Sequence, residues 1–110
     1  MTGIHPTLAR ARRAERRSAA PSPRDAELAR LARALANPAR VAILRRLIAS
    51  GERVCGEIVN GLPLAQATVS QHLKVLWDAG LIQGEVVGPR VCYRANQRAV
   101  RRIMELISGL

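Results

Sequence analysis

The stretch Ala67-Thr68-Val69-Ser70-Gln71-His72-Leu73-Lys74-Val75-Leu76 decides the fold of this 110-residue chain. At roughly 100° per residue, Val69, Leu73 and Leu76 fall on one side of a helix that the pattern predicts over residues 65–79. The other side is polar but carries little charge, with Ala67, Ser70, Gln71 and Lys74 opposite the apolar stripe and Gln66, Thr68 and His72 at its flanks. A merely solvated helix favours Glu and Lys, whereas Gln and Ser donate to and accept from base edges.

A hairpin is predicted directly after this helix. Gly80 ends the helix, residues 81–87 and 91–95 alternate as two strands, and Gly88-Pro89 supplies the turn with Arg90 at its tip. Before the helix, the turn at Gly61-Leu62-Pro63 follows a short helix predicted over residues 56–60 and an extended piece at residues 53–55. A helix pair with a tight turn, followed by a hairpin, is typical of a winged helix-turn-helix.

Three longer helices complete the chain. The first is predicted from Ser22 or Pro23 to Ala36, and the second runs from Pro38 to about Ser50, with Asn37 as its cap and Gly51 as its end. In the second helix a broad apolar face is expected from Val41, Ile43, Leu44, Leu47 and Ile48, and the last helix is predicted over residues 97–108. The fold class is therefore mainly α with a small β-hairpin wing, in the order α-α-α-α-β-β-α, over residues 25–110.

The charge is high and uneven. The chain has 18 Lys and Arg against 8 Asp and Glu, a net charge of +10, and residues 1–24 hold six of the arginines and only one acid. That segment has almost no large apolar residue, so we expect a basic arm that is disordered or orders only on binding. A polyanion is the simplest partner for such charge, and improved solubility with a composition bias toward Arg is the alternative. Aromatics make up only 2% of the chain, which disfavours binding modes that stack bases.

The sequence resembles the ArsR/SmtB family of bacterial repressors. The resemblance rests on Leu35-Ala36-Asn37-Pro38-Ala39-Arg40-Val41-Ala42-Ile43-Leu44, on the stretch 67–76 followed by Ala79-Gly80-Leu81-Ile82, and on Gly88-Pro89-Arg90-Val91-Cys92-Tyr93-Arg94. It implies a homodimer that binds a palindromic operator in double-stranded DNA and is released by a chemical signal. In this family the first and last helices form the dimer interface, as two terminal apolar stripes in so small a domain also favour.

Two sets of site residues follow. The predicted DNA contacts, on the fourth helix and the wing, are Gln66, Thr68, Ser70, Gln71, His72, Lys74, Arg90 and Arg94. For His72 a partly buried position in the helix flank is the equal alternative. The predicted dimer contacts are Leu28, Leu31, Leu35, Val100, Ile103 and Ile107, with a purely intramolecular core as the alternative.

The signal is predicted from the cysteines. Family members that sense soft metals at the third helix carry Cys-x-Cys, whereas this chain has Val54-Cys55-Gly56-Glu57-Ile58, and its last helix offers only Glu105 to a zinc site. In a winged helix the extended piece pairs with the second wing strand, which would bring Cys55 near Cys92. We therefore hypothesise a thiol switch that is oxidised or bridged by As(III) or another thiophilic ion. The alternative is two small buried hydrophobes.

The sequence thus predicts a DNA-binding transcriptional regulator, a homodimeric repressor released by a thiol-reactive or metalloid signal. The alternatives are a winged-helix module that binds a protein partner and a DNA-binding protein that senses nothing. An enzyme is not expected, because no phosphate loop, acid-base cluster or activated nucleophile is present. Neither a signal peptide nor an apolar run of about 20 residues occurs, so we expect a cytoplasmic protein without a membrane partner.

Overall fold

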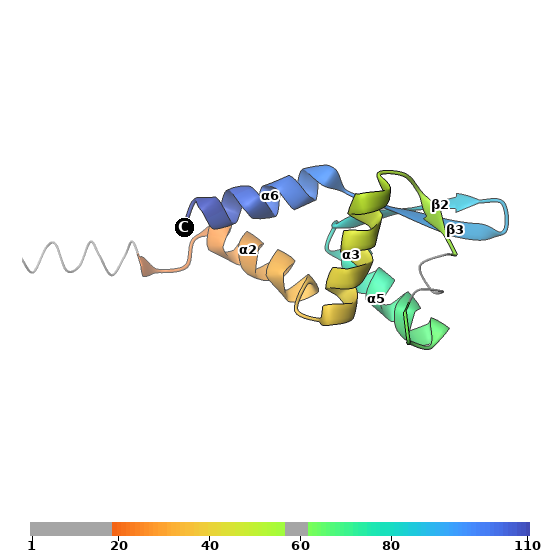
Figure 1. Ribbon diagram of the computed structural model, residues 1–110. Helices are drawn as coiled ribbons and strands as arrows, with labels where there is room; N and C mark the ends of the chain where they lie inside the picture. The colour runs from red at the N-terminus through yellow and green to blue at the C-terminus, as the bar shows by residue number, and fades with distance from the viewer. Residues whose placement is uncertain (1–18, 57–61) are drawn as a thin grey trace, which may run out of the picture.

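The computed structural model describes residues 19–56 and 62–110 (Figure 1). Its elements follow the order α2 (Pro23–Ala34), α3 (Pro38–Ser50), β1 (Val54–Cys55), α5 (Gln66–Asp78), β2 (Ile82–Val87), β3 (Arg90–Ala95) and α6 (Gln97–Ser108). The short helix predicted over residues 56–60 lies outside the described residues except for Gly56. Residues 1–18 of the predicted basic arm also lie outside the described residues. The winged helix-turn-helix fold class is confirmed.

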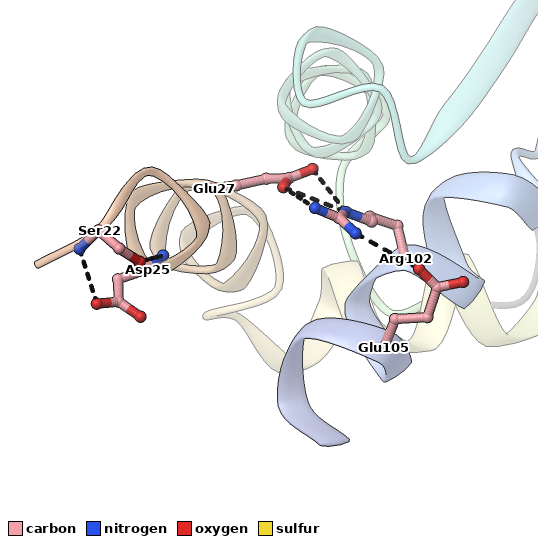
Figure 2. Close-up of polar contacts among 5 residues, drawn as sticks. All are labelled: Ser22, Asp25, Glu27, Arg102 and Glu105. Carbon is pink, nitrogen blue, oxygen red and sulfur yellow. Dashed lines mark hydrogen bonds and ion pairs between the residues drawn. The ribbon is translucent and has the colours of Figure 1, made fainter. Parts of the chain in front are cut away.

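The helices begin where their caps predict. Ser22 and Asp25 form a capping box at the start of α2, with the Ser22 hydroxyl accepting from the Asp25 amide and the Asp25 carboxylate accepting from the Ser22 amide (Figure 2). Asn37 caps α3 by accepting from two backbone amides, and Gly51 ends it in the left-handed region at φ 68°. Helix α2 ends at Ala34, two residues before the predicted end, because the chain leaves the helix at Leu35.

The hairpin and the extended piece form one small antiparallel sheet with the strand order β1-β3-β2. Val87 pairs with Arg90 across the turn, so Arg90 lies at the tip as predicted. At the other edge of β3, Val54 pairs with Tyr93 and Cys55 with Cys92, which confirms the predicted pairing of the extended piece with the second wing strand. The wing therefore projects from the end of the domain opposite the chain's C-terminus (Figure 1).

An aliphatic core joins the helices to the base of the sheet. It contains Leu31, Ala34, Ile43, Leu44, Leu47, Val54, Val69, Leu73, Leu76, Leu81, Ile82, Ile103 and Leu106. The predicted stripe of α5 is fully confirmed, but the face predicted for α3 is too wide. Val41 and Ile48 are exposed, and the buried residues of α3 are Ile43, Leu44 and Leu47.

Helices α2 and α6 lie side by side at the end of the domain away from the wing (Figure 1). Arg102 of α6 donates from Nε and Nη2 to the Glu27 carboxylate of α2, with a shortest distance of 2.7 Å, and from Nη1 to Glu105 at 3.4 Å (Figure 2). The Arg102 hydrogen bond lowers the pKa of Glu27, and the Glu27 hydrogen bond raises that of Arg102. This charged pair ties together two helices whose residues lie 75 positions apart.

Candidate DNA-binding surface and cysteine pair

The polar face of α5 is open to solvent. Gln66, Ser70, Gln71 and Lys74 are exposed, and Thr68 is half-buried, because the helix packs through its opposite stripe. Lys74 forms an exposed ion pair with Asp78 at 2.9 Å, one turn further along. The uncharged amide and hydroxyl groups near the start of α5 are therefore free to hydrogen-bond to a partner.

His72 lies apart from this face. It is half-buried, and its Nδ1 is 3.3 Å from Nη1 of Arg40, whose Nε donates to the Ala34 carbonyl at 2.6 Å. A guanidinium has only donors, so His72 Nδ1 accepts in this contact. Of the two interpretations of His72, the geometry favours the partly buried one, in which the imidazole links α5 to the junction of α2 and α3.

Two of the predicted contacts on α5 share a cavity with the tip of the wing. Gln66 and Ser70 of α5 line one cavity of about 380 Å³ together with Pro89, Arg90 and Tyr93. A recognition helix and a wing that open onto the same hollow can contact a base edge and a nearby phosphate at once. Arg94 is exposed as well, but it does not line this cavity.

Arg94 lies beside the cysteines instead. It lines a cavity of about 370 Å³ with Cys92, Trp77 and Arg53, and a second cavity of about 450 Å³ with Cys55 and Arg53. Arg53 forms an ion pair with Glu85 at 2.7 Å. The structure thus divides the predicted wing contacts between two places, with Arg90 next to α5 and Arg94 next to the sulfur atoms.

Cys55 and Cys92 are joined by a disulfide between β1 and β3. Their Cα atoms lie 4.3 Å apart, so the predicted approach of the two cysteines within one chain is confirmed. Cys92 is buried, with 1% of its surface exposed, and Cys55 is half-buried. The two cysteine residues therefore differ in exposure.

Sequence reasoning missed the contact between α5 and the wing. The indole of Trp77 lies over Gly84 of β2, where an added Cβ would be 2.5 Å from Cη2, and it meets the ring of Tyr93 edge-on with centroids 5.9 Å apart. Because Gly84 and Tyr93 are paired across the strands, the indole covers one cross-strand pair next to the disulfide. An isolated Gly inside a predicted strand was the only available signal of this close approach.

The predicted dimer contacts fall into three classes. Leu31 and Ile103 are already buried within the single chain, Leu28, Leu35 and Val100 are half-buried, and Ile107 is 54% exposed. Met104, which is 62% exposed, accompanies Ile107 on α6, and Leu110 follows at the C-terminus. Exposed aliphatic side chains of this kind are candidates for burial against a second copy.

The described part of the chain lacks two features that other functions need. Between residues 19–56 and 62–110, no three His, Cys, Asp or Glu side chains are grouped so that they could hold a metal ion. Over the same residues, none of the helices combines the length and apolar character needed to span a bilayer.

Comparison with known proteins identifies the family. A family model described as a helix-turn-helix domain matches residues 35–85. The HTH-type transcriptional repressor SmtB of Mycobacterium tuberculosis is 46% identical over 87 residues, which cover 77% of this chain and 64% of the relative. The chain thus spans less than two thirds of SmtB's length. The transcriptional regulator CmtR of Mycobacterium tuberculosis and Mycobacterium bovis is 38% identical over 87 residues, covering 76% of this chain and 71% of CmtR.

A solved structure extends the similarity to the fold. The homodimeric winged helix-turn-helix DNA-binding domain of a possible ArsR-family regulator from Mycobacterium bovis superimposes with a TM-score of 0.61 at 25% identity, covering 99% of this chain and 88% of that domain. Sequence and structure agree, and this chain belongs to the ArsR/SmtB family of winged helix-turn-helix transcriptional regulators, which are DNA-binding proteins and not enzymes.

Proposed function

We propose that this protein is a homodimeric repressor in the cytoplasm that binds a palindromic operator and is released from it when Cys55 and Cys92 are oxidised. The observation that carries the proposal is the exposed amide and hydroxyl face of α5, which opens with Arg90 onto one cavity. In this role α5 enters the major groove, with Gln66, Thr68, Ser70 and Gln71 directed to base edges, while Arg90 contacts phosphates. The basic segment 1–24 adds affinity that does not depend on sequence.

Gln71 provides the test of base reading. Its replacement in Gln71→Ala should weaken binding to the protein's own upstream DNA by about 1–3 kcal/mol, because a bidentate amide contact is lost, and should leave binding to scrambled DNA nearly unchanged. The measurement is fluorescence anisotropy with both DNAs at one salt concentration. Gln97→Ala, at an exposed glutamine of α6, is the matched control. Equal weakening on both DNAs would make Gln71 a backbone contact, and the absence of any preference for upstream DNA would favour a protein-binding module.

The dimer in this proposal uses α2 and α6. Two observations support it, namely the exposed Met104 and Ile107 on α6 and the homodimeric state of the Mycobacterium bovis domain. Half-buried Leu28 and Val100 would complete the contact at the edge of the α2–α6 pair. Leu31 and Ile103 contribute less than the sequence predicts, since each is already covered within its own chain.

The disulfide is the proposed switch. It ties β3 of the wing to β1, the strand that leads through residues 56–65 into α5. In this proposal the wing and the recognition helix shift relative to each other when they dock on DNA, as parts of many regulatory proteins do on binding, and a covalent tie at the base of the wing restricts that shift. The dithiol form is therefore the operator-binding form in this proposal, and the disulfide form binds more weakly.

Operator affinity in the two redox states tests the switch. We expect oxidised protein to bind upstream DNA at least tenfold more weakly than reduced protein, and both Cys55→Ser and Cys92→Ser to bind with the affinity of reduced protein under either condition. Equal affinity in both states would remove the switch and leave operator binding intact. Arsenite and zinc are tested in the same assay. If arsenite released the DNA from the reduced wild-type protein but not from the two Ser variants, metalloid binding would replace oxidation as the signal.

The residues present favour oxidation over a bound ion. The chain has only two cysteines, and the described residues bring no third His, Cys, Asp or Glu to them. Structural sites for soft ions usually gather three or four ligands. Two thiols at paired positions of adjacent strands, in contrast, need no further protein side chain to form a disulfide, and their two electrons and two protons pass to an external oxidant such as a peroxide.

A further inference from the structure

We infer that the two cavities flanking the Cys55–Cys92 disulfide form a docking site for a small anionic thiol, and that this thiol reduces the disulfide by attacking Cys55. The inference deepens the proposed switch, because it names the chemical class of molecule that resets it. Only the effect of this reduction on operator binding rests on the proposed switch, because docking of the thiol and reduction of the disulfide are measured without DNA.

The first observation is the shape of the site. A cavity of about 370 Å³ lies against Cys92 and is bounded by Trp77, Gly84 and Arg94. A second cavity, of about 450 Å³, lies against Cys55. These volumes are in the range of pockets that hold small molecules. Each cavity is therefore large enough for a molecule the size of a short peptide to lie alongside the disulfide.

The second observation is the charge of the site. Arg53 and Arg94 line both cavities, and they flank the paired residues Val54 and Tyr93, so that the antiparallel register sets them opposite each other. Like charges in opposite positions on adjacent strands are unfavourable unless an anion lies between them. Arg53 has Glu85 as a partner at 2.7 Å. Arg94 has no carboxylate within ion-pair distance anywhere in residues 19–56 and 62–110. Glu85 also lines the cavity at Cys92 and Glu52 the cavity at Cys55, so each cavity has two arginines and one glutamate. The remaining positive charge, with Arg94 outside any ion pair of the described residues, favours an anionic group on the incoming molecule.

The third observation is the unequal exposure of the two cysteine residues. Cys55 is half-buried, whereas Cys92 is only 1% exposed. Exchange requires that a thiolate reach the sulfur it attacks, and a nearby positive charge favours the thiolate that leaves. In this proposal the more exposed residue, Cys55, is the one attacked, and Arg53 and Arg94, which line the cavities at both cysteines, favour the departure of Cys92 as a thiolate.

The exchange balances in two steps. The external thiolate forms a bond to Cys55 Sγ, the bond between the two protein sulfurs breaks, and Cys92 leaves with its electron pair. A second external thiolate then attacks the small-molecule sulfur of the mixed disulfide and releases Cys55 as a thiolate. Two external thiols are oxidised to one disulfide, the protein disulfide is reduced, and the protons that the thiols lost are available to the two cysteines.

Reduction kinetics test the site on the full-length oxidised protein without DNA. The probes are 2-mercaptoethanesulfonate, which is anionic, 2-mercaptoethanol, which is neutral, and cysteamine, which is cationic. Reactions are stopped with acid and analysed by mass spectrometry, and rate constants are referred to thiolate concentration. We expect the anionic probe to react about tenfold faster than the neutral one, through electrostatic attraction to the site. This preference should fall with added salt.

Matched arginine variants separate the site from the general charge of the chain. In Arg94→Gln the rate ratio of the anionic to the neutral probe should fall to within about twofold of unity. The ratio should be kept in Arg94→Lys, which retains the charge, and in Arg98→Gln, which removes an exposed arginine on α6. An equal loss in Arg94→Gln and Arg98→Gln, or no preference in the wild type, would overturn the docking site. Peptide mapping of the trapped mixed disulfide should place the probe on Cys55, and its presence on Cys92 would overturn the direction of attack.

The outcome is independent of the operator experiment. A charge preference that depends on Arg94, together with equal DNA affinity in both redox states, would keep the thiol site and reject the switch. The reverse combination would keep the switch and reject the site.

Discussion

The two ends of the domain are held together by different kinds of contact. At the α2–α6 end, two amphipathic helices pack through aliphatic side chains, and the Glu27–Arg102 pair ties them together. At the wing end, a thin sheet carries one disulfide and an indole that lies over a glycine. The first end is built for a fixed association, and the second contains a bond that can be made and broken. This contrast places the proposed dimer and the proposed switch at opposite ends of the molecule.

The largest expected effect tests the dimer end. Ile107→Glu should weaken self-association by about 3–5 kcal/mol, because it would bury an uncompensated charge in the proposed interface. Sedimentation velocity measures the change, with circular dichroism to confirm that the chain remains folded. Val86→Glu, at a wing valine that is 75% exposed, is the control and should leave self-association intact. If Val86→Glu lost the dimer and Ile107→Glu kept it, the dimer interface would lie at the wing end and not at the α2–α6 end.

A smaller effect is expected at the contact between α5 and the wing. Gly84→Ala should lower the free energy of unfolding by about 1–3 kcal/mol, because the new Cβ overlaps the indole and forces Trp77 to move. Urea denaturation measures this cost. In a Trp77→Ala background the same substitution should cost little, which a double-mutant cycle detects as coupling. An equal cost in both backgrounds would show that the glycine is needed by the backbone of β2 and not by the indole.

The smallest expected effect is the pH dependence of the Glu27–Arg102 pair. The hydrogen bond from Arg102 lowers the pKa of Glu27 in the folded protein, so the unfolded chain binds a proton first as pH falls. The pair therefore stabilises the fold fully above the ordinary glutamate pKa of about 4.3 and loses its contribution as pH falls through the lower pKa of folded Glu27. Arg102 stays charged throughout this range.

Unfolding free energies between pH 6 and pH 3 check this prediction. The difference between the wild type and Glu27→Gln should shrink as the pH falls, whereas Glu52→Gln, at an exposed glutamate, should show no such change. A difference that stayed constant across the range would mean that Glu27 contributes by packing and not by charge.

The sequence by itself determined the order of the elements that the structure describes and most of their bounds. Capping residues such as Ser22 and Asn37, the stripe of α5 and the Gly88-Pro89 turn each act within about four neighbouring positions, so local chemistry fixes them. The strand order of a winged helix then allowed the approach of Cys55 and Cys92 to be predicted, although they are 37 positions apart.

Only the tertiary structure decided how the helices cross, and the remaining features depend on that. It places Trp77 over Gly84, Glu27 against Arg102, His72 against Arg40 and Arg94 beside the disulfide. It also leaves Val41 and Ile48 exposed on a face that periodicity alone predicts to be buried. Periodicity records which residues share a side of a helix, but the width of the buried face depends on the shape of the neighbour, and no local pattern contains that information.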